Sequence, residues 1–312
     1  LLHDGIQSCD RRGVDIMVSG GIYAALPSPF DADGALDRAA LVSLVGKLLD
    51  RGVEGFYVGG STGECFLLDE AEREAALEAV VKAAAGRAPV IAHVGALSTA
   101  AAVRLARHAA SRGVAAVSAT PPFYFTYGLD EIGAYYADIA QASGLPVLVY
   151  NIPAFSGRNF GADGLDRLLS IPGVAGLKHT SMNLHELERI RSRHPDKLLL
   201  SGYDEVFLPA LSMGSDGMIG STVNLMPELF LGIRAAFKAG DMARAGALQA
   251  KVNAAVEVLA AVPFFPALKC ALASAGSPCG ECRKPFLPLG EEAKATITEK
   301  LTALGVIGKG SR

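Results

Sequence analysis

The sequence lacks both a hydrophobic run long enough to cross a membrane and any concentration of basic residues. No apolar stretch of the 312-residue chain approaches the roughly 18 residues that a membrane span requires. Its 29 lysine and arginine residues are outnumbered by 32 aspartate and glutamate residues, which gives a formal charge of −3, and they form no stripe or run. These absences argue against a membrane or a nucleic acid as a partner.

Cysteine is also scarce. The chain has five cysteines, and an odd number in a chain of this length makes a disulfide framework improbable. Cys279 and Cys282 have C-x-x-C spacing, but no second ligand pair accompanies them as in a zinc site, and they do not open a helix after a strand as a redox pair does. We interpret them as loop cysteines without either role.

What the chain has in quantity is apolar side chains, since hydrophobic residues make up 50% and charged residues 20%. This composition can fill a large core, and the length suits one large α/β barrel or two ordinary domains. The first 16 residues do not combine a basic stretch with an apolar one, as a signal peptide does. Because Met17 precedes the first barrel-like strand, we interpret residues 1–16 as an extension foreign to the native protein, which we expect to be cytoplasmic.

Short apolar runs alternate with amphipathic segments from residue 22 onward. The runs predict strands at residues 22–26, 55–58, 90–94, 115–119, 147–150, 174–178, 198–201 and 217–220. Between them lie helical patterns, one of which opens with Asp69 and Glu72 at the spacing of a capping box. Eight strand-then-helix units over about 220 residues predict a (β/α)8 TIM barrel.

The alternative for such a pattern is a doubly wound open sheet. That fold predicts a glycine-rich fingerprint after the first strand, where this chain has Pro27-Ser28-Pro29-Phe30 instead. Further helical patterns at 227–239, 241–261, 264–275 and 291–304 predict an all-helical C-terminal extension. We therefore expect the barrel to span residues 17–225, with the last barrel helix and the helical extension over 226–312.

One charged residue ends an apolar strand. Lys178 closes the run Val174-Ala175-Gly176-Leu177, and a lysine is almost never fully buried without a partner. A desolvated amine has a pKa lowered toward 7–8 and becomes a nucleophile for carbonyl groups. The alternative is a lysine at the last position of the strand whose side-chain ammonium lies in solvent and has no chemical role.

Other reactive side chains stand at the ends of the predicted strands, where TIM barrels carry their chemistry. The turn Gly59-Gly60-Ser61-Thr62-Gly63 is either a nest of backbone N–H groups for an anion or a tight turn with a helix cap. Tyr150 is either a proton-transfer group, whose phenol pKa a neighbouring ammonium could lower, or an amphipathic strand-end tyrosine. Asp204 and Glu205 are either ligand-binding acids or the cap of the seventh helix.

Two histidines lie within or at the end of the predicted strands. We expect His93 to be a strand-interior polar group whose hydrogen bonds are satisfied within the barrel. His179 follows Lys178 without His, Cys or Asp companions at ligand spacing, so we predict no metal site there.

Taken together, these motifs resemble the dihydrodipicolinate synthase / N-acetylneuraminate lyase superfamily. The resemblance covers roughly residues 20–290, and 28 residues separate the tyrosine of Tyr150-Asn-Ile-Pro153 from the lysine of Gly176-Leu-Lys178. The stretches that carry it are Tyr57-Val-Gly-Gly-Ser-Thr-Gly-Glu64, Ile91-Ala-His-Val-Gly95, Tyr150-Asn-Ile-Pro-Ala154, Leu177-Lys178, Gly202-Tyr-Asp-Glu205, Ile219-Gly-Ser-Thr222 and Cys282-Arg-Lys-Pro-Phe286.

The resemblance implies a mechanism without metal or organic cofactor. Lys178 forms a Schiff base with the keto carbon of pyruvate or of the sugar acid, and Tyr150 exchanges a proton with the sugar C4 hydroxyl. Ser61 and Thr62 hold the pyruvyl carboxylate. The resemblance further implies a homotetramer in which Tyr124 enters the neighbouring subunit's site and forms a proton relay with Ser61 and Tyr150.

The substrate implied by the resemblance is N-acetylneuraminate, cleaved to N-acetyl-D-mannosamine and pyruvate. Dihydrodipicolinate synthases carry an arginine five residues after the tyrosine for a second carboxylate, and here that position is Phe155. The polar groups expected to bind a polyhydroxylated tail are Thr180, Gly202, Asp204, Glu205 and Ser221. Two alternatives stay open: an aldolase or dehydratase of the same superfamily acting on a shorter 2-keto-3-deoxy sugar acid, and a non-catalytic sugar-acid-binding barrel.

His179 and the aromatic pair Phe264-Phe265 depart from the usual lyase sequence. His179 stands where the lyases commonly have glutamine, and the two phenylalanines are expected on the pocket rim, where preference for the tail is often set. Neither change removes a catalytic group, so together they leave the preference for the acyl group and the tail open.

Overall fold

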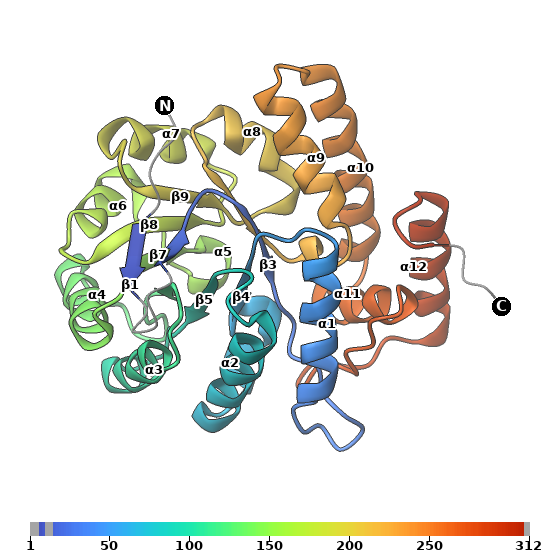
Figure 1. Cartoon of the computed structure of the whole chain (residues 1–312), viewed down its shortest axis with the longest axis horizontal. Coiled ribbons are helices and arrows are strands. Elements are labelled where there is room, and N and C mark those ends of the chain that lie inside the picture. The colour runs from blue at the N-terminus through green and yellow to red at the C-terminus, as the bar shows by residue number, and fades with distance from the viewer. Residues whose placement is uncertain (1–5, 10–14, 309–312) are drawn as a thin grey trace.

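The computed structural model describes residues 6–9 and 15–308. Eight parallel strands close into a barrel in the order β10-β3-β4-β5-β6-β7-β8-β9, which confirms the predicted TIM barrel (Figure 1). The strands are β3 (Ile22–Ala25), β4 (Gly55–Val58), β5 (Val90–His93), β6 (Ala116–Ala119), β7 (Val147–Asn151), β8 (Val174–His179), β9 (Leu198–Ser201) and β10 (Gly217–Gly220).

The ring closes between the first and the last barrel strand. Met218 of β10 pairs with Ile22 of β3, while the other edge of β3 pairs with β4. Because every strand is covered by neighbours on both sides and by helices outside, the strands read in sequence as continuous apolar runs rather than as alternating ones.

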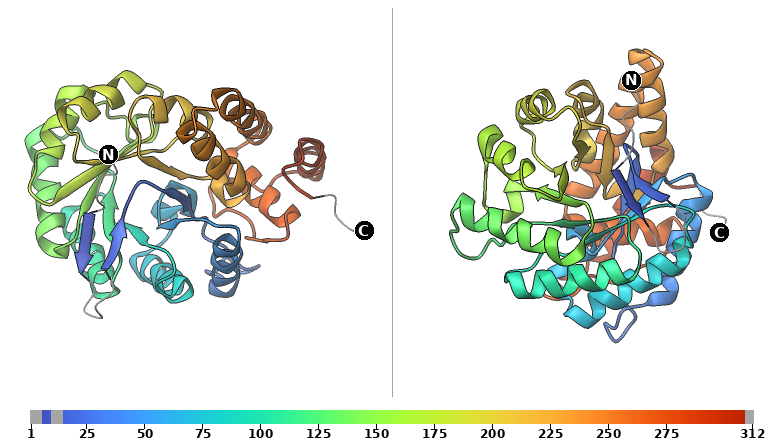
Figure 2. Two further views of the ribbon diagram at one scale, coloured as in Figure 1. Left: turned by 45° about the horizontal axis from the view of Figure 1, so that its top comes forward. Right: turned by 60° about the vertical axis from the view of Figure 1, so that its left-hand side comes forward.

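An outer layer of helices surrounds the strands (Figures 1 and 2). It consists of α1 (Arg38–Asp50), α2 (Glu70–Ala84), α3 (Thr99–Ser111), α4 (Leu129–Ser143), α6 (Gly161–Leu169), α7 (Leu184–Arg193), α8 (Phe207–Ser212) and α9 (Pro227–Lys238). The predicted capping box is present, since Asp69 accepts from the Glu72 N–H and Glu72 accepts from the Asp69 N–H. Such a cap satisfies two of the unpaired N–H groups at a helix start.

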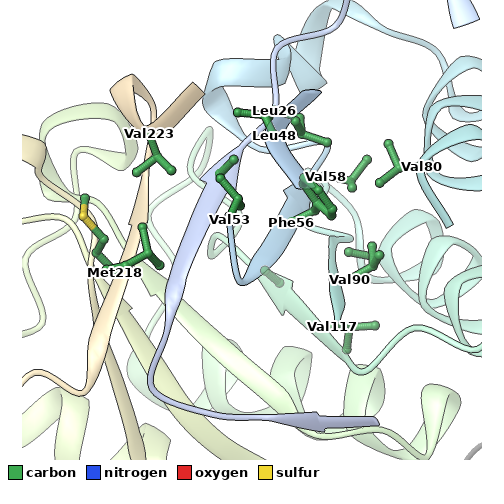
Figure 3. Packing of buried hydrophobic residues seen from close by; sticks show 14 of the residues in the cluster. Leu26, Leu48, Val53, Phe56, Val58, Val80, Val90, Val117, Met218 and Val223 are labelled. Atoms are coloured by element: carbon green, nitrogen blue, oxygen red, sulfur yellow. The ribbon is translucent and has the colours of Figure 1, made fainter. Parts of the chain in front are cut away.

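Apolar side chains fill two layers. Between the strands and the outer helices, Phe56 and Val58 of β4 pack in the same buried cluster as Leu48 of α1 and Val80 of α2 (Figure 3). Inside the ring lies a second cluster, which includes Tyr23, Tyr57, Ile91, Leu148, Leu200 and Ile219. The barrel interior is therefore a packed core that leaves room for a ligand only at its mouth.

Three helices extend the chain beyond the barrel: α10 (Met242–Ala260), α11 (Phe264–Ser274) and α12 (Glu291–Ala303). They lie together on one side of the ring in Figure 1 and in the left-hand view of Figure 2. Their positions agree with the predicted helical segments, and we retain the division at residues 17–225 and 226–312 as a proposal. No single helix of the described residues is long and apolar enough to cross a membrane, although α10 and α11 pass that test together across a 113° bend.

A small sheet precedes the barrel and was not predicted. Strand β1 (Ile6–Cys9) pairs antiparallel with β2 (Asp15–Val18), apart from the barrel sheet. Residues 1–5 and 10–14 of the predicted extension lie outside the described residues. The interpretation of residues 1–16 as foreign to the native chain therefore stays a prediction.

Four short 3₁₀ turns and one short helix shape the loops at the mouth of the barrel. They are η1 (Ser61–Gly63), η2 (Cys65–Leu67), η3 (Asp204–Val206), η4 (Thr222–Asn224) and α5 (Pro153–Ser156). Each follows the C-terminal end of a strand, so the polar residues that they carry face a common mouth.

Candidate active site

Lys178 lies near the C-terminal end of β8 and is 3% exposed. It is the direct partner of Tyr150 on the neighbouring parallel strand β7. Lys178 Nζ sits between two rings, 4.0 Å from the ring centroid of Tyr150 and 4.1 Å from that of Tyr57. Burial lowers the pKa of Lys178 to about 7, an effect that the carboxyl of Asp204 opposes. The alternative of a solvent-exposed lysine head is therefore wrong.

Tyr150 is buried as deeply as Lys178. Burial raises the pKa of Tyr150 to about 12, and the neighbouring hydroxyls of Ser61 and Thr180 only partly offset the rise. The expectation that a neighbouring ammonium lowers this pKa is wrong, because the loss of hydration on burial is the largest effect and raises it. At neutral pH the phenol therefore carries its proton.

The Gly-Ser-Thr-Gly turn follows β4 as the 3₁₀ turn η1. Its backbone closes on itself, since the Gly63 N–H donates to Gly60 O at 3.0 Å and the Glu64 N–H donates to Ser61 O at 3.0 Å. Thr62 Oγ1 lies 2.7 Å from Ser221 Oγ at the end of β10. This hydrogen bond joins the loop after β4 to the loop after β10. The hydroxyl-bearing residues Ser61, Thr62 and Ser221 line the same cavity as Lys178.

Asp204 is buried in η3 rather than capping the seventh helix. Its Oδ2 accepts from the Thr222 N–H at 2.8 Å, and its Oδ1 has no hydrogen-bond partner within the described residues. Burial raises the pKa of Asp204 to about 6, which hydrogen bonding to Thr222 limits. An unsatisfied buried carboxylate oxygen is a strong acceptor for a ligand hydroxyl.

Gly202 and Thr180 form the wall between β8 and β9. The Thr180 N–H donates to Asn151 O at 2.8 Å, and the Gly202 N–H donates to His179 O at 2.9 Å. A Cβ atom at Gly202 would lie 1.8 Å from Thr180 Oγ1, so only glycine leaves room for that hydroxyl. Thr180 Oγ1 is buried and makes no hydrogen bond within the described residues.

These groups line one cavity of about 250 Å³ at the barrel mouth. Nine of the ten predicted site residues line it: Ser61, Thr62, Tyr150, Lys178, Thr180, Gly202, Asp204, Glu205 and Ser221. Its remaining wall is formed by Ile152, Phe155, Tyr203, Val256, Ala260, Phe264 and Phe265. The lining thus combines hydroxyl and carboxyl groups with aromatic and aliphatic side chains.

Tyr124, the tenth predicted site residue, does not line this cavity. Its side chain is 76% exposed in the loop after β6. The preceding residue, Phe123, lines a second cavity of about 350 Å³ that shares Ser61, Ile152, Phe155 and Phe265 with the first. Within one chain, Tyr124 is therefore separate from Lys178 and Tyr150.

His93 and His179 are both held by hydrogen bonds. His93 Nδ1 lies 2.8 Å from Gly59 O, and its Nε2 accepts from the Thr120 N–H at 3.2 Å, as expected of a satisfied strand histidine. His179 Nδ1 lies 3.2 Å from Asn151 Nδ2, and burial lowers the pKa of His179 to about 4. His179 is consequently a neutral packing group behind Lys178 at physiological pH.

Tyr57 and the α10 part of the cavity wall were not predicted from the sequence, whereas Phe264 and Phe265 at the start of α11 line the cavity as expected. The ring of Tyr57 lies under Lys178 Nζ, and its hydroxyl donates to Ser118 Oγ at 3.2 Å. Tyr57 stands in an apolar strand and carried no signal beyond its position beside the Gly-Ser-Thr motif. Val256 and Ala260 are ordinary helix residues, and only the packing of α10 across the mouth gives them a role.

Comparison with known proteins places this geometry in a family. Residues 18–304 match the dihydrodipicolinate synthetase family. The chain is 43% identical over 279 residues to an N-acetylneuraminate lyase of Rhizobium meliloti (strain 1021), covering 89% of this chain and 93% of the relative. It is 45% identical over 276 residues to an N-acetylneuraminate lyase of Escherichia coli (strain SMS-3-5 / SECEC), covering 87% and 92%.

A solved structure is similar along almost its whole length. CdNal from Clostridium difficile, crystallised in complex with mannosamine, superposes with a TM-score of 0.89 at 31% identity. The match covers 91% of this chain and 98% of that one. The barrel, the strand-end residues and these likenesses agree, and the chain belongs to the dihydrodipicolinate synthetase family.

Proposed function

We propose that this chain is a Schiff-base (class I) aldolase that cleaves N-acetylneuraminate reversibly to N-acetyl-D-mannosamine and pyruvate. The observation that carries the proposal is Lys178, a buried amine with a pKa of about 7 at the mouth of a barrel, paired with Tyr150 on the next strand. The lyases that are 43% and 45% identical to the chain support this choice of substrate.

In the proposed reaction, neutral Lys178 Nζ attacks the C2 keto carbon of the open-chain sugar acid, and water leaves as the imine forms. The protonated imine withdraws electrons, so the C3–C4 bond can break with its electron pair moving toward C2. This leaves an enamine on Lys178 and an aldehyde at the former C4. Protonation of the enamine at C3 and addition of water then release pyruvate and restore the amine.

Breaking the C3–C4 bond requires removal of the proton from the C4 hydroxyl. The phenol of Tyr150 is protonated at neutral pH, because its pKa is about 12. We therefore assign Tyr150 to a relay: its oxygen accepts the C4 proton while its own proton passes to the substrate carboxylate. Ser61 and Thr62 hold that carboxylate beside the phenol, as their places in the cavity allow.

The tail of the substrate meets the polar side chains of the cavity. Asp204 offers a buried acceptor oxygen, and Glu205, Thr180 and Ser221 add further polar groups. Phe155 occupies the position where an arginine would be needed to bind a second carboxylate, so the site favours a polyhydroxylated tail over an acidic one.

A coupled assay of pyruvate release tests this function. N-acetylneuraminate should be turned over with a higher kcat/KM than 2-keto-3-deoxygluconate. The reverse preference would replace the lyase with the shorter-chain aldolase. Borohydride with pyruvate should add mass on Lys178, and its failure to do so would favour a non-catalytic binding barrel.

The assembly and location of the protein are part of the same proposal. A homotetramer would bring the exposed Tyr124 of one subunit to the cavity of another, where it could join Ser61 and Tyr150. Light scattering should give four times the chain mass, and Tyr124→Phe should lower kcat without dissociating the assembly. The free state of Cys65, Cys270, Cys279 and Cys282 supports a reducing, cytoplasmic location.

A further inference from the structure

A buried ion pair joins the catalytic turn to the C-terminal helices. Lys269 Nζ of α11 lies 2.7 Å from Glu64 Oε1, and the two side chains are 3% and 0% exposed. Glu64 follows directly on the Ser61–Gly63 turn. Two opposite charges buried so completely take no part in the chemistry assigned above, although they stand next to it.

The backbone of Glu64 is the second observation. Its φ of 54° and ψ of 36° lie in the left-handed region, which residues other than glycine, asparagine and aspartate seldom adopt. In this conformation its N–H closes the turn on Ser61 O. Such a conformation persists only where the surroundings hold it in place.

The surroundings that hold the Glu64 side chain all come from the C-terminal part of the chain. Glu64 Oε2 accepts from the Arg283 N–H at 2.8 Å. Lys269 Nζ also donates to Glu281 O at 3.1 Å and lies 4.3 Å from the ring centroid of Phe30. Both carboxylate oxygens are therefore engaged by groups that are far away in sequence.

We infer that the Glu64–Lys269 pair is a positioning device that fixes the Ser61–Thr62 turn for the pyruvyl carboxylate. The inference rests on the proposed function, because it concerns how the substrate of that reaction is held. Glu64 and Lys269 are positioning residues: they act through the backbone of the turn, which Ser28 Oγ also fixes by donating to Gly63 O at 2.7 Å.

A positioning role and a purely structural one predict different kinetics. The pyruvyl carboxylate is bound in both ground state and transition state, so a misplaced turn raises KM with a smaller change in kcat. A purely structural pair lowers the melting temperature and the amount of folded enzyme, and it leaves the KM of the folded fraction unchanged.

The test compares the variants Glu64→Gln, Lys269→Met and the double variant in the condensation direction, with pyruvate as the varied substrate. Each single variant should lower the melting temperature, because it leaves one buried charge without its partner. The double variant removes both charges, so its melting temperature should recover. Its KM for pyruvate should nevertheless stay raised at least tenfold, because the contact between residue 64 and Lys269 no longer helps to hold the turn.

Arg191 and Asp216 provide a matched control at the other end of the barrel. Their side chains form an ion pair of 2.5 Å that joins α7 to the segment before β10. Arg191→Met combined with Asp216→Asn should lower the melting temperature with less than a twofold change in KM for pyruvate. An equal rise in KM for this control would show that any loss of stability disturbs the turn, which would overturn the inference.

The outcome also separates this inference from the proposed function. Wild-type enzyme that forms a borohydride-trapped pyruvate adduct on Lys178, together with a double variant of normal KM, would overturn the positioning role alone. Wild-type enzyme that forms no adduct would overturn both. The concentration of pyruvate that gives half-maximal trapping should shift in the variants by the same factor as KM.

Discussion

Lys178 and Tyr150 are paired residues on adjacent parallel strands, and the lysine amine lies over the tyrosine ring, 4.0 Å from its centroid. Neighbours in register on a parallel sheet direct their side chains to the same side of it. The pairing therefore brings together a nucleophile and a proton carrier without any help from loops. Two rigid strands hold the geometry that the proposed imine chemistry needs.

Replacing Lys178 should abolish turnover. Alanine removes the amine, and arginine keeps a charge but cannot form the imine. Pyruvate release should fall to background in Lys178→Ala and Lys178→Arg, and neither should gain mass with pyruvate and borohydride. Substantial residual turnover in a folded variant would mean that another group is the nucleophile.

Tyr150→Phe should lower kcat by about 10²–10⁴, the usual contribution of a positioned acid or base. Trapping of pyruvate on Lys178 should persist, because imine formation does not need the C4 proton relay. Tyr23→Phe is the matched control: its side chain is also buried, but its hydroxyl donates to Ser19 O before β3 and does not line the cavity. A kcat near wild type for Tyr150→Phe would remove this residue from the relay.

The reaction with pyruvate should depend on pH through the amine. With a pKa of about 7, Lys178 is mostly protonated below pH 7 and mostly neutral above it. Only the neutral form attacks a carbonyl, so kcat/KM for pyruvate should rise through pH 7 and level off above it. A rise centred near pH 10 would contradict the burial of the amine.

Removing the buried amine should stabilise the fold. The pKa of Lys178 is lower in the folded protein than in the unfolded chain, so between pH 7 and 10.5 the unfolded chain binds the additional proton. The free energy of unfolding of the wild type consequently rises between pH 7 and 10.5. Each unit of pKa difference corresponds to about 1.4 kcal/mol, and Lys178→Met should be more stable than wild type by a few kcal/mol at pH 7.

The difference in unfolding free energy between wild type and Lys178→Met should shrink as the pH approaches 10.5, where the lysine of the unfolded chain begins to lose its proton as well. Urea unfolding at pH 6, 8 and 10 measures it. Equal stabilities at pH 6 would show that Lys178 carries no burial penalty.

Gly202→Ala should weaken binding of the substrate tail. Its new Cβ would lie 1.8 Å from Thr180 Oγ1, so the threonine hydroxyl must move. We expect KM for N-acetylneuraminate to rise about tenfold, on the scale of one lost hydrogen bond. Gly46→Ala in α1 meets no atom within 4 Å and should bind normally, with stability raised by up to about 1 kcal/mol.

The sequence predicted the barrel strands to within one residue because strands buried on both faces are continuous apolar runs. The ends of these runs drew attention to Lys178 and Tyr150, but the local pattern left their roles open. The catalytic roles came from the resemblance to the superfamily and stay predictions. The ribbon of β1 and β2 was missed, since residues 1–16 were interpreted as an extension foreign to the native protein and no strand was sought before residue 22. The environment of Tyr150 was also misjudged, because the extent of burial is set by packing around the barrel.

Contacts between segments distant in sequence were beyond prediction. Asp204 binds the Thr222 N–H across two strands, and nothing local distinguishes that arrangement from a helix cap. Glu64 and Lys269 are common residues until α11 is packed on the turn. The placement of Tyr124 beside another subunit's lysine depends on an interface and stays a prediction.

The pairing of β3 with β10, the first and the last strand of the barrel, affects how the chain can fold. During synthesis β3 emerges early with a partner for only one edge, and the other edge waits for the last barrel strand. An apolar edge left open for so long can pair with a second chain. Refolding should therefore lose yield as protein concentration rises. A circularly permuted chain that begins just before β10 would move the open edge from β3 to the side of β10 that pairs with β9.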